Sequence, residues 1–187
     1  MTKRIGICAV QGAFAEHCAA LERIGAVTVI IRGKEELRGL DALVLPGGES
    51  TAQGLLLRAL GLFEPMRKMI KEGLPAYGTC AGMILLAKDI ENDSRRHLAI
   101  MDIKVRRNGY GRQLSSFNVR GTFAGLDDVE MPFIRAPYIS GTGSGVEVLA
   151  ETDGLATAAR ENNMLVTAFH PEVTDDTRVH EYFLSMI

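Results

Sequence analysis

The chain has 187 residues, of which 47% are hydrophobic and 24% charged, and its formal net charge is −2. This composition is ordinary for a globular protein, and the length predicts a single domain over residues 1–187 whose core needs neither metal nor disulfide. The charge offers no basis for binding nucleic acid or an anionic membrane. No apolar run approaches the length of a membrane span, and the first residues do not resemble a signal peptide.

The three cysteines are Cys8, Cys18 and Cys80. An odd, low count without a paired CxxC spacing argues against a disulfide framework and against a structural zinc site. The count fits a reducing compartment, so we expect a cytoplasmic protein without a metal site.

The first half of the chain alternates between short apolar runs and segments with helical spacing. The expected strands cover residues 5–10, 27–31, 41–45 and 75–79, and the expected helices cover 13–24, 50–60, 63–72 and 81–88. Glycines at positions 25, 61 and 73 end three of the helices, and Ser50 or Thr51 can cap the helix that starts there. Such alternation is typical of a parallel sheet with helices on both faces.

The second half of the chain is richer in strands. Strand character is found in residues 100–106, 115–122, 132–136, 146–152, 156–161 and 165–169. The glycine-rich stretch 141–145 is interpreted as a flexible hairpin loop, and residues 175–187 as a last helix capped by Thr174. We therefore predict a three-layer α/β fold, in which a flavodoxin-like, mostly parallel central sheet carries an antiparallel extension and has helices on both faces.

Residues Gly78-Thr79-Cys80-Ala81-Gly82 join a predicted strand to a predicted helix. A nucleophile between two glycines at such a junction is typical of a sharp turn that presents one side chain to a cleft. The following helix points its free N–H groups and the positive end of its dipole at the sulfur, which favours a reactive thiolate. Because free cysteine is among the most buried residue types, the pentapeptide alone also fits a structural cysteine.

A cysteine nucleophile needs a base and a group that orients the base. The histidines at positions 17, 97 and 180 lie in a helical pattern, a polar loop and the last helix, where surface or packing roles are expected. His170 instead ends an apolar strand, and the proline after it restricts it to extended geometry. Residues two apart on an extended chain point to the same side, so His170 and Glu172 can face one cleft. The alternative is a strand end with a solvated histidine and glutamate.

Residues 46–51, Pro-Gly-Gly-Glu-Ser-Thr, form a turn between a strand and a helix. Backbone N–H groups at such a turn are free to meet an anion. The pattern lacks the lysine of a Walker motif and the spacing of a dinucleotide fingerprint. Two alternative interpretations of the turn are a tight turn with a helix cap and a phosphate cradle. Beside a cysteine nucleophile the turn suits an oxyanion hole, formed by the backbone of Gly47 and Gly48 together with the N–H of Ala81.

Three of these segments together resemble the class I, or triad, glutamine amidotransferases: residues 45–51, 78–82 and 169–172. Other segments resemble a narrower group within this class, the glutaminase subunits of pyridoxal 5'-phosphate synthases. These segments are residues 10–13 with 16–17, 107–113, 116–117 and 133–137. The resemblance extends over nearly the whole chain. The sequence departs from the usual pattern at Asn118, where an acidic residue is common, and at Val173, where leucine is.

The resemblance implies a role for each matching residue. Cys80 is the expected nucleophile, His170 the general base and acid, and Glu172 the orienting carboxylate. The expected glutamine site is lined by Gly48, Glu49, Ser50, Arg107, Ile134 and Arg135. Arg107 is expected to meet the charged end of the substrate, which suits a bidentate guanidinium, and a solvated charge beside Arg106 is the alternative. No cofactor is implied.

The implied reaction is hydrolysis of L-glutamine to L-glutamate and ammonia through a glutamyl thioester. The ammonia is expected to pass to a separate (β/α)₈ synthase subunit, so that the complex acts as a lyase that makes pyridoxal 5'-phosphate from ribose 5-phosphate and glyceraldehyde 3-phosphate. The resemblance implies a complex of twelve glutaminase and twelve synthase subunits, with residues 11–17 near the docking face and the oxyanion turn. Two alternatives are a glutaminase that serves histidine or tryptophan synthesis and a non-enzymatic, chaperone-like protein with a cysteine elbow.

Overall fold

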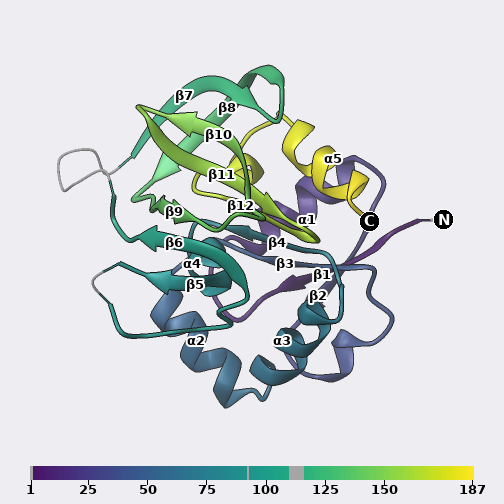
Figure 1. Cartoon of the computed structure of the whole chain (residues 1–187). Coiled ribbons are helices and arrows are strands. Elements are labelled where there is room, and N and C mark those ends of the chain that lie inside the picture. The colour runs from purple at the N-terminus through teal and green to yellow at the C-terminus, as the bar shows by residue number, and fades with distance from the viewer. Residues whose placement is uncertain (1, 92, 110–115) are drawn as a thin grey trace.

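Strands and helices alternate along the first half of the chain in the computed structural model, which describes residues 2–91, 93–109 and 116–187 (Figure 1). The strands are β1 (Arg4–Cys8), β2 (Val27–Ile31), β3 (Ala42–Leu45), β4 (Ala76–Thr79), β5 (Ala87–Ile90), β6 (Met101–Arg106), β7 (Ser116–Phe123), β8 (Leu126–Ile134), β9 (Tyr138–Thr142), β10 (Glu147–Thr152), β11 (Leu155–Glu161) and β12 (Met164–Thr167). The α-helices are α1 (Phe14–Arg23), α2 (Ser50–Ala59), α3 (Phe63–Lys71), α4 (Ala81–Leu86) and α5 (Arg178–Ser185). Two short 3-10 helices are η1 (Glu35–Leu37) and η2 (Pro171–Val173).

The main sheet runs in the order β2-β1-β3-β4-β12-β11-β9-β6-β5, and β10 pairs with β11 beside this path. Its first five strands are parallel to one another. Every residue of β3, β4 and β12 is buried, as expected for central parallel strands with both faces covered. Helices α2 and α3 lie on one side of this part of the sheet, and α1 and α5 lie on the other (Figure 1). The predicted three-layer α/β architecture is confirmed.

The antiparallel extension is also present, but it is smaller than predicted. Strands β12, β11, β9 and β6 pair in antiparallel fashion, whereas the terminal pair β5–β6 is parallel. Strand β9 was not expected, because residues 141–145 were interpreted as a hairpin loop. Residues 141 and 142 of this stretch belong to the strand instead. Strand β5 was not expected either, and the prediction that residues 87 and 88 continue a helix was wrong.

Helix α4 ends early because later residues take the carbonyl groups that would continue it. The N–H groups of Leu98 and Ile100 donate to the carbonyl oxygens of Leu85 and Leu86, at 2.9 Å each. The chain leaves the helix at Ala87 with an extended ψ of 135° and pairs with β6. Sequence periodicity cannot reveal this ending, since the competing donors lie more than ten residues further along the chain.

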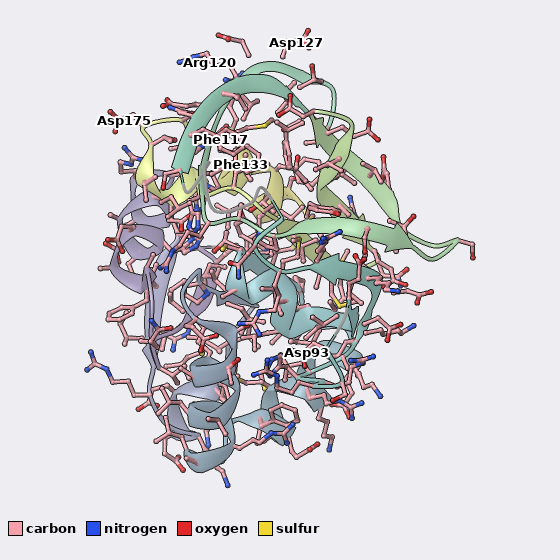
Figure 2. The ribbon with its side chains drawn as sticks, turned by 90° about the vertical axis from the view of Figure 1, so that its left-hand side faces the viewer. Asp93, Phe117, Arg120, Asp127, Phe133 and Asp175 are labelled. Carbon is pink, nitrogen blue, oxygen red and sulfur yellow. The ribbon has the colours of Figure 1, made fainter. Side chains whose placement is uncertain are left out.

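Strands β7 and β8 form a separate two-stranded ribbon, which corrects the expectation that they extend the main sheet. Strand β8 is longer than the predicted segment 132–136 and ends at Ile134. Phe117 stacks on Phe133 with ring centroids 4.7 Å apart. Figure 2 shows this pair nearer the body of the molecule, and Arg120 and Asp127 at the outer end of the ribbon. Phe123 and Phe133 of the ribbon also meet Phe169, which follows β12, with ring centroids 6.3 and 5.7 Å apart. Aromatic packing, and not a strand ladder, therefore joins the ribbon to the main sheet.

Two predicted helix caps were wrong. The cap of α2 is Glu49, whose carboxylate accepts hydrogen bonds from the N–H groups of residues 51 and 52, in place of Ser50 or Thr51. Helix α5 begins at Arg178 and not at residue 175, and the hydroxyl of Thr174 instead accepts from the N–H of Asp176 in the turn before it. The remaining elements differ from prediction by one or two residues at their ends.

Residues 110–113 of the motif 107–113, and residue 115, the predicted start of a strand, lie outside the described residues. Within the ranges that the structure describes, none of the helices is both long and apolar enough to cross a membrane.

Candidate active site

Cys80 lies at the sharp turn between β4 and α4. Its backbone has a φ of 49° and a ψ of −99°, a conformation that side-chain-bearing residues rarely adopt and that is common where strain serves a functional site. Both flanking glycines are required by close packing. A Cβ on Gly78 would lie 2.6 Å from the backbone of Gly82, and a Cβ on Gly82 would lie 1.9 Å from the carbonyl oxygen of Leu45. The glycines therefore allow α4 to start directly against β3 and to hold the cysteine at the turn.

We expect Gly82→Ala to destabilise the protein by about 3 kcal/mol or more, the upper end of the cost of overpacking a core. The added methyl meets the backbone oxygen of Leu45, which cannot rotate away as a flexible side chain would. Urea unfolding monitored by circular dichroism measures the change. Gly145→Ala is the matched control, since its Cβ would have no neighbour closer than 3.8 Å. An equal, small effect of both substitutions would contradict the close approach of α4 to β3.

His170 and Glu172 lie next to the cysteine as a buried pair. The Nδ1 atom of His170 is 2.7 Å from Oε1 of Glu172, and the two residues are 6% and 5% exposed. The side chains of His170 and Cys80 both line the same cavity, and Cys80 lies close enough to influence the imidazole. The backbone N–H of His170 donates to the carbonyl oxygen of Pro132, so the ribbon strand β8 helps to fix this residue. The solvated strand end considered above is excluded by this burial.

The pKa shifts of the pair favour opposite charges. Burial alone would lower the pKa of His170, but its interactions with Cys80 and Glu172 and their charges raise the pKa to about 10. Burial alone would raise the pKa of Glu172, but the hydrogen bond from His170 and the charge of His170 lower it. An ionised Glu172 thus holds a protonated His170 beside the sulfur, where the imidazolium can return a proton to a departing group.

A cavity of about 420 Å³ opens in front of Cys80 and His170. Among the predicted site residues, those that line it are Gly47, Gly48, Glu49, Ser50, Cys80, Ala81, Arg107, Ile134, Arg135 and His170. Glu172 lies behind His170 rather than in the wall. The wall also contains residues that were not among the predicted catalytic, oxyanion or substrate-binding positions: Gln11, Gly12, Ala13, Ile84, Asn108, Pro137 and Val173. In the described residues, no group of His, Cys, Asp or Glu side chains is placed to hold a metal ion.

The Gly47-Gly48 turn is held by the segment after β1. The N–H of Ala13 donates to the carbonyl oxygen of Gly47 at 3.1 Å, and the N–H of Glu49 donates to Oε1 of Gln11 at 2.8 Å. A Cβ on Gly47 would lie 2.3 Å from Cε1 of His170, so only glycine fits against the imidazole. The turn therefore lies in contact with the His170 side chain, and residues 11–13 determine which way its peptide groups point.

Arg107 enters the cavity as part of a charged cluster. Its guanidinium lies 3.0 Å from Oε1 of Glu49 and 3.5 Å from Oδ2 of Asp93, and its side chain is 28% exposed. The alternative of a solvated charge is therefore wrong. Asp93 was not predicted, since it lies in a polar loop without a motif, and a hydrogen bond from Arg95 holds its pKa below the usual range. The cluster places both signs of charge at one end of the cavity.

Behind Glu172 lies a second buried group, which consists of His17, Thr79 and His180. His17 places Nε2 3.0 Å from the hydroxyl oxygen of Thr79 and Nδ1 3.1 Å from Nε2 of His180. Both histidines are fully buried, which agrees with the expected packing role. Burial lowers the pKa of His17, and burial is also the largest cause that lowers the pKa of His180, to about 3.

These lowered pKa values predict acid lability. Between pH 6.5 and about 3 the unfolded chain binds a proton at residue 180 and the folded chain does not, so stability is lost as the pH falls through this window. The expected slope from His180 is about 1.4 kcal/mol per pH unit. Urea unfolding at a series of pH values measures it, and His180→Phe should flatten the profile. An unchanged slope in that variant would mean that His180 is already protonated in the folded state.

Known proteins with similar sequences or structures were compared with this chain. The profile of the SNO glutamine amidotransferase family matches residues 7–187. The chain is 55% identical to the pyridoxal 5'-phosphate synthase subunit PdxT of Methanocorpusculum labreanum, over 98% of this chain and 97% of the relative, and 50% identical to the PdxT of Bifidobacterium longum, over 97% and 99%. A crystal structure described as a glutamine amidotransferase superposes with a TM-score of 0.93 at 43% identity and covers 97% of both chains. The chain therefore belongs to the SNO glutamine amidotransferase family.

Proposed function

We propose that this protein hydrolyses L-glutamine to L-glutamate and ammonia as the glutaminase subunit of a pyridoxal 5'-phosphate synthase. The observation that carries the proposal is the buried His170–Glu172 pair beside Cys80, at a strained turn that opens into a cavity. A cysteine, a histidine and a carboxylate in this order make up a nucleophile, a base and its orienting group. The name of the family supports glutamine as the substrate, and the names of the relatives support the pathway.

In the proposed reaction, Cys80 attacks the carboxamide carbon of glutamine with its thiolate sulfur. The tetrahedral oxyanion is stabilised by backbone N–H groups of the Gly47-Gly48 turn and of Ala81 at the start of α4. His170 donates its proton to the leaving nitrogen, the C–N bond breaks, and ammonia departs from a glutamyl thioester. Water then attacks the thioester with His170 as general base, which releases glutamate and restores the thiol.

The charged cluster at the cavity suits the other end of the substrate. A free amino acid carries a carboxylate and an ammonium group, and Arg107 and Glu49 offer one complementary charge to each. Asp93 holds Arg107 from its other side at 3.5 Å. Ser50, Ile134 and the remaining wall residues then shape the space between this cluster and Cys80.

The proposed partner is a (β/α)₈ synthase subunit that accepts the ammonia and makes pyridoxal 5'-phosphate from ribose 5-phosphate and glyceraldehyde 3-phosphate. The family resemblance supports a cytoplasmic complex of twelve subunits of each kind. Residues 11–13 both line the cavity and hold the Gly47-Gly48 turn, so a partner that contacts this segment can act on the oxyanion site.

The test is ammonia release from glutamine by the purified protein, alone and with the synthase subunit of the same organism. Formation of pyridoxal 5'-phosphate from the two sugar phosphates is measured in parallel, with glutamine or with ammonium chloride as nitrogen source. We expect this protein to be required with glutamine and dispensable with ammonium. Ammonia release without any transfer to the synthase would support a glutaminase of another pathway, and no release in either setting would exclude the proposed reaction.

A further inference from the structure

The carboxylate oxygen of Glu172 that does not contact His170 faces another histidine, His17, which has no role in the proposed mechanism. Oε1 of Glu172 is hydrogen-bonded to His170, whereas the buried Oε2 has no hydrogen-bond partner among the described residues. Nε2 of His17 lies 3.7 Å from this Oε2, and both side chains are fully buried. A buried carboxylate oxygen without a hydrogen-bond donor costs folding free energy. The N–H group nearest to this oxygen therefore influences the orientation of the carboxylate.

We propose that His17 is a positioning residue of the hydrolytic site: its Nε2–H is directed at the Thr79 hydroxyl and at Oε2 of Glu172, and it holds this carboxylate in the orientation that His170 requires. This inference rests on the proposed function, because it assigns a role within the same triad. Thr79 comes directly before Cys80, so the contact also joins α1 to the turn that carries the nucleophile.

The hydrogen bonds of the two buried histidines select this tautomer. If His17 carried its proton on Nδ1, it would donate to Nε2 of His180, and His180 would then carry a proton on Nδ1, which has no partner among the described residues. The bare Nε2 of His17 would at the same time face the carboxylate of Glu172 with a lone pair. With the proton on Nε2, the lone-pair clash with Glu172 is removed, and His180 donates to His17 while its Nδ1 stays a bare acceptor rather than a buried N–H without a partner.

The surroundings of His17 keep it neutral and confine its ring. The groups that face it are Glu172 from η2, His170, His180 from α5, and the Tyr77 ring, which meets it edge-on with centroids 5.8 Å apart. Glu16 lies next to it on α1 and favours its protonation slightly, but burial is the larger influence and lowers the pKa of His17. A neutral imidazole can supply one directed N–H without adding a second positive charge behind the triad.

The tautomer is tested on the wild-type protein, without any need for activity. Nitrogen-15 NMR of protein labelled in histidine distinguishes protonated from bare ring nitrogens, and the signals that disappear in His17→Leu assign His17. We expect a protonated Nε2 and a bare Nδ1 on His17. A protonated Nδ1 on a neutral His17 would overturn the proposal, whether or not the protein hydrolyses glutamine.

The positioning role is tested by kinetics in the complex with the synthase subunit. His17→Leu removes the donor and should lower kcat by at least about tenfold with little change in KM, a loss typical of removing a partner that orients a functional histidine. His17→Gln places an amide nitrogen near the position of Nε2 and should restore most of the rate. Equal losses in both variants, or a change in KM alone, would overturn the proposal. If the wild-type complex releases no ammonia, the proposed function fails, while the NMR result still decides the tautomer.

Discussion

Replacing Cys80 by alanine should lower glutamine hydrolysis by about 10³-fold or more, because the proposed thioester cannot form without the sulfur. The substitution removes few contacts, since the Cys80 side chain is small and lies at the wall of the cavity. The protein should therefore still fold and still bind the synthase subunit. Ammonia release in the complex, with binding to the synthase checked by gel filtration, measures the effect.

Cys18→Ala is the matched control for this substitution. Cys18 is a half-buried residue on α1 and does not line the cavity, so its loss should leave the rate unchanged. Full activity in Cys80→Ala would refute the proposed nucleophile and would mean that another group attacks the carboxamide of glutamine.

His170→Asn should lower the rate of the chemical step by several orders of magnitude. Asparagine can keep a hydrogen bond to Glu172 but offers neither a base for the attacking water nor an acid for the departing ammonia. Single-turnover measurement of ammonia release separates this step from product release. His97→Asn is the control, because His97 lies in a loop outside the cavity wall. A loss of less than about tenfold in His170→Asn would indicate that another group acts as the base.

The parallel half of the fold could be predicted well because its signals are local. Short continuous apolar runs such as Ala42–Leu45 are typical of strands that are buried on both faces of a sheet. Each of these runs is followed by a segment with helical spacing. The ribbon β7–β8 could not be separated from the main sheet in this way. Its alternating pattern fits any half-buried antiparallel pair, and its place on the fold depends on aromatic contacts with distant residues, such as Phe133 with Phe169.

Helix ends were less predictable because they depend on competing hydrogen bonds. The sequence Glu49-Ser50-Thr51 offers three residues that can accept from free N–H groups at the start of a helix. Glu49 makes these bonds in the structure while its carboxylate also binds Arg107. A pattern of residue types cannot rank such competitors, since the position of Arg107 is set by the end of β6 on the other part of the sheet.

The candidate site was predictable where two residues are close in the chain and not where they are distant. His170 and Glu172 were expected to share one side of an extended chain, and the structure does join them at 2.7 Å. The expected extended geometry was wrong, because residues 171–173 form the 3-10 helix η2, which brings the two side chains together by a turn instead. The contact of Arg107 with Asp93 and the approach of His17 to Glu172 both join distant segments. Which face of α1 meets η2 follows only from the packed fold, so sequence alone suggested packing for His17 and nothing more specific.

Covalent labelling of the nucleophile tests the central claim most directly. A glutamine analogue that carries a diazoketone in place of the carboxamide should bind in the cavity and alkylate the residue that attacks the substrate carbon. After incubation of the complex with this analogue, peptide mass spectrometry should find the adduct on Cys80 and not on Cys8 or Cys18, and excess glutamine should slow its formation. An adduct on another residue, or none while glutamine is still hydrolysed, would contradict the proposed mechanism.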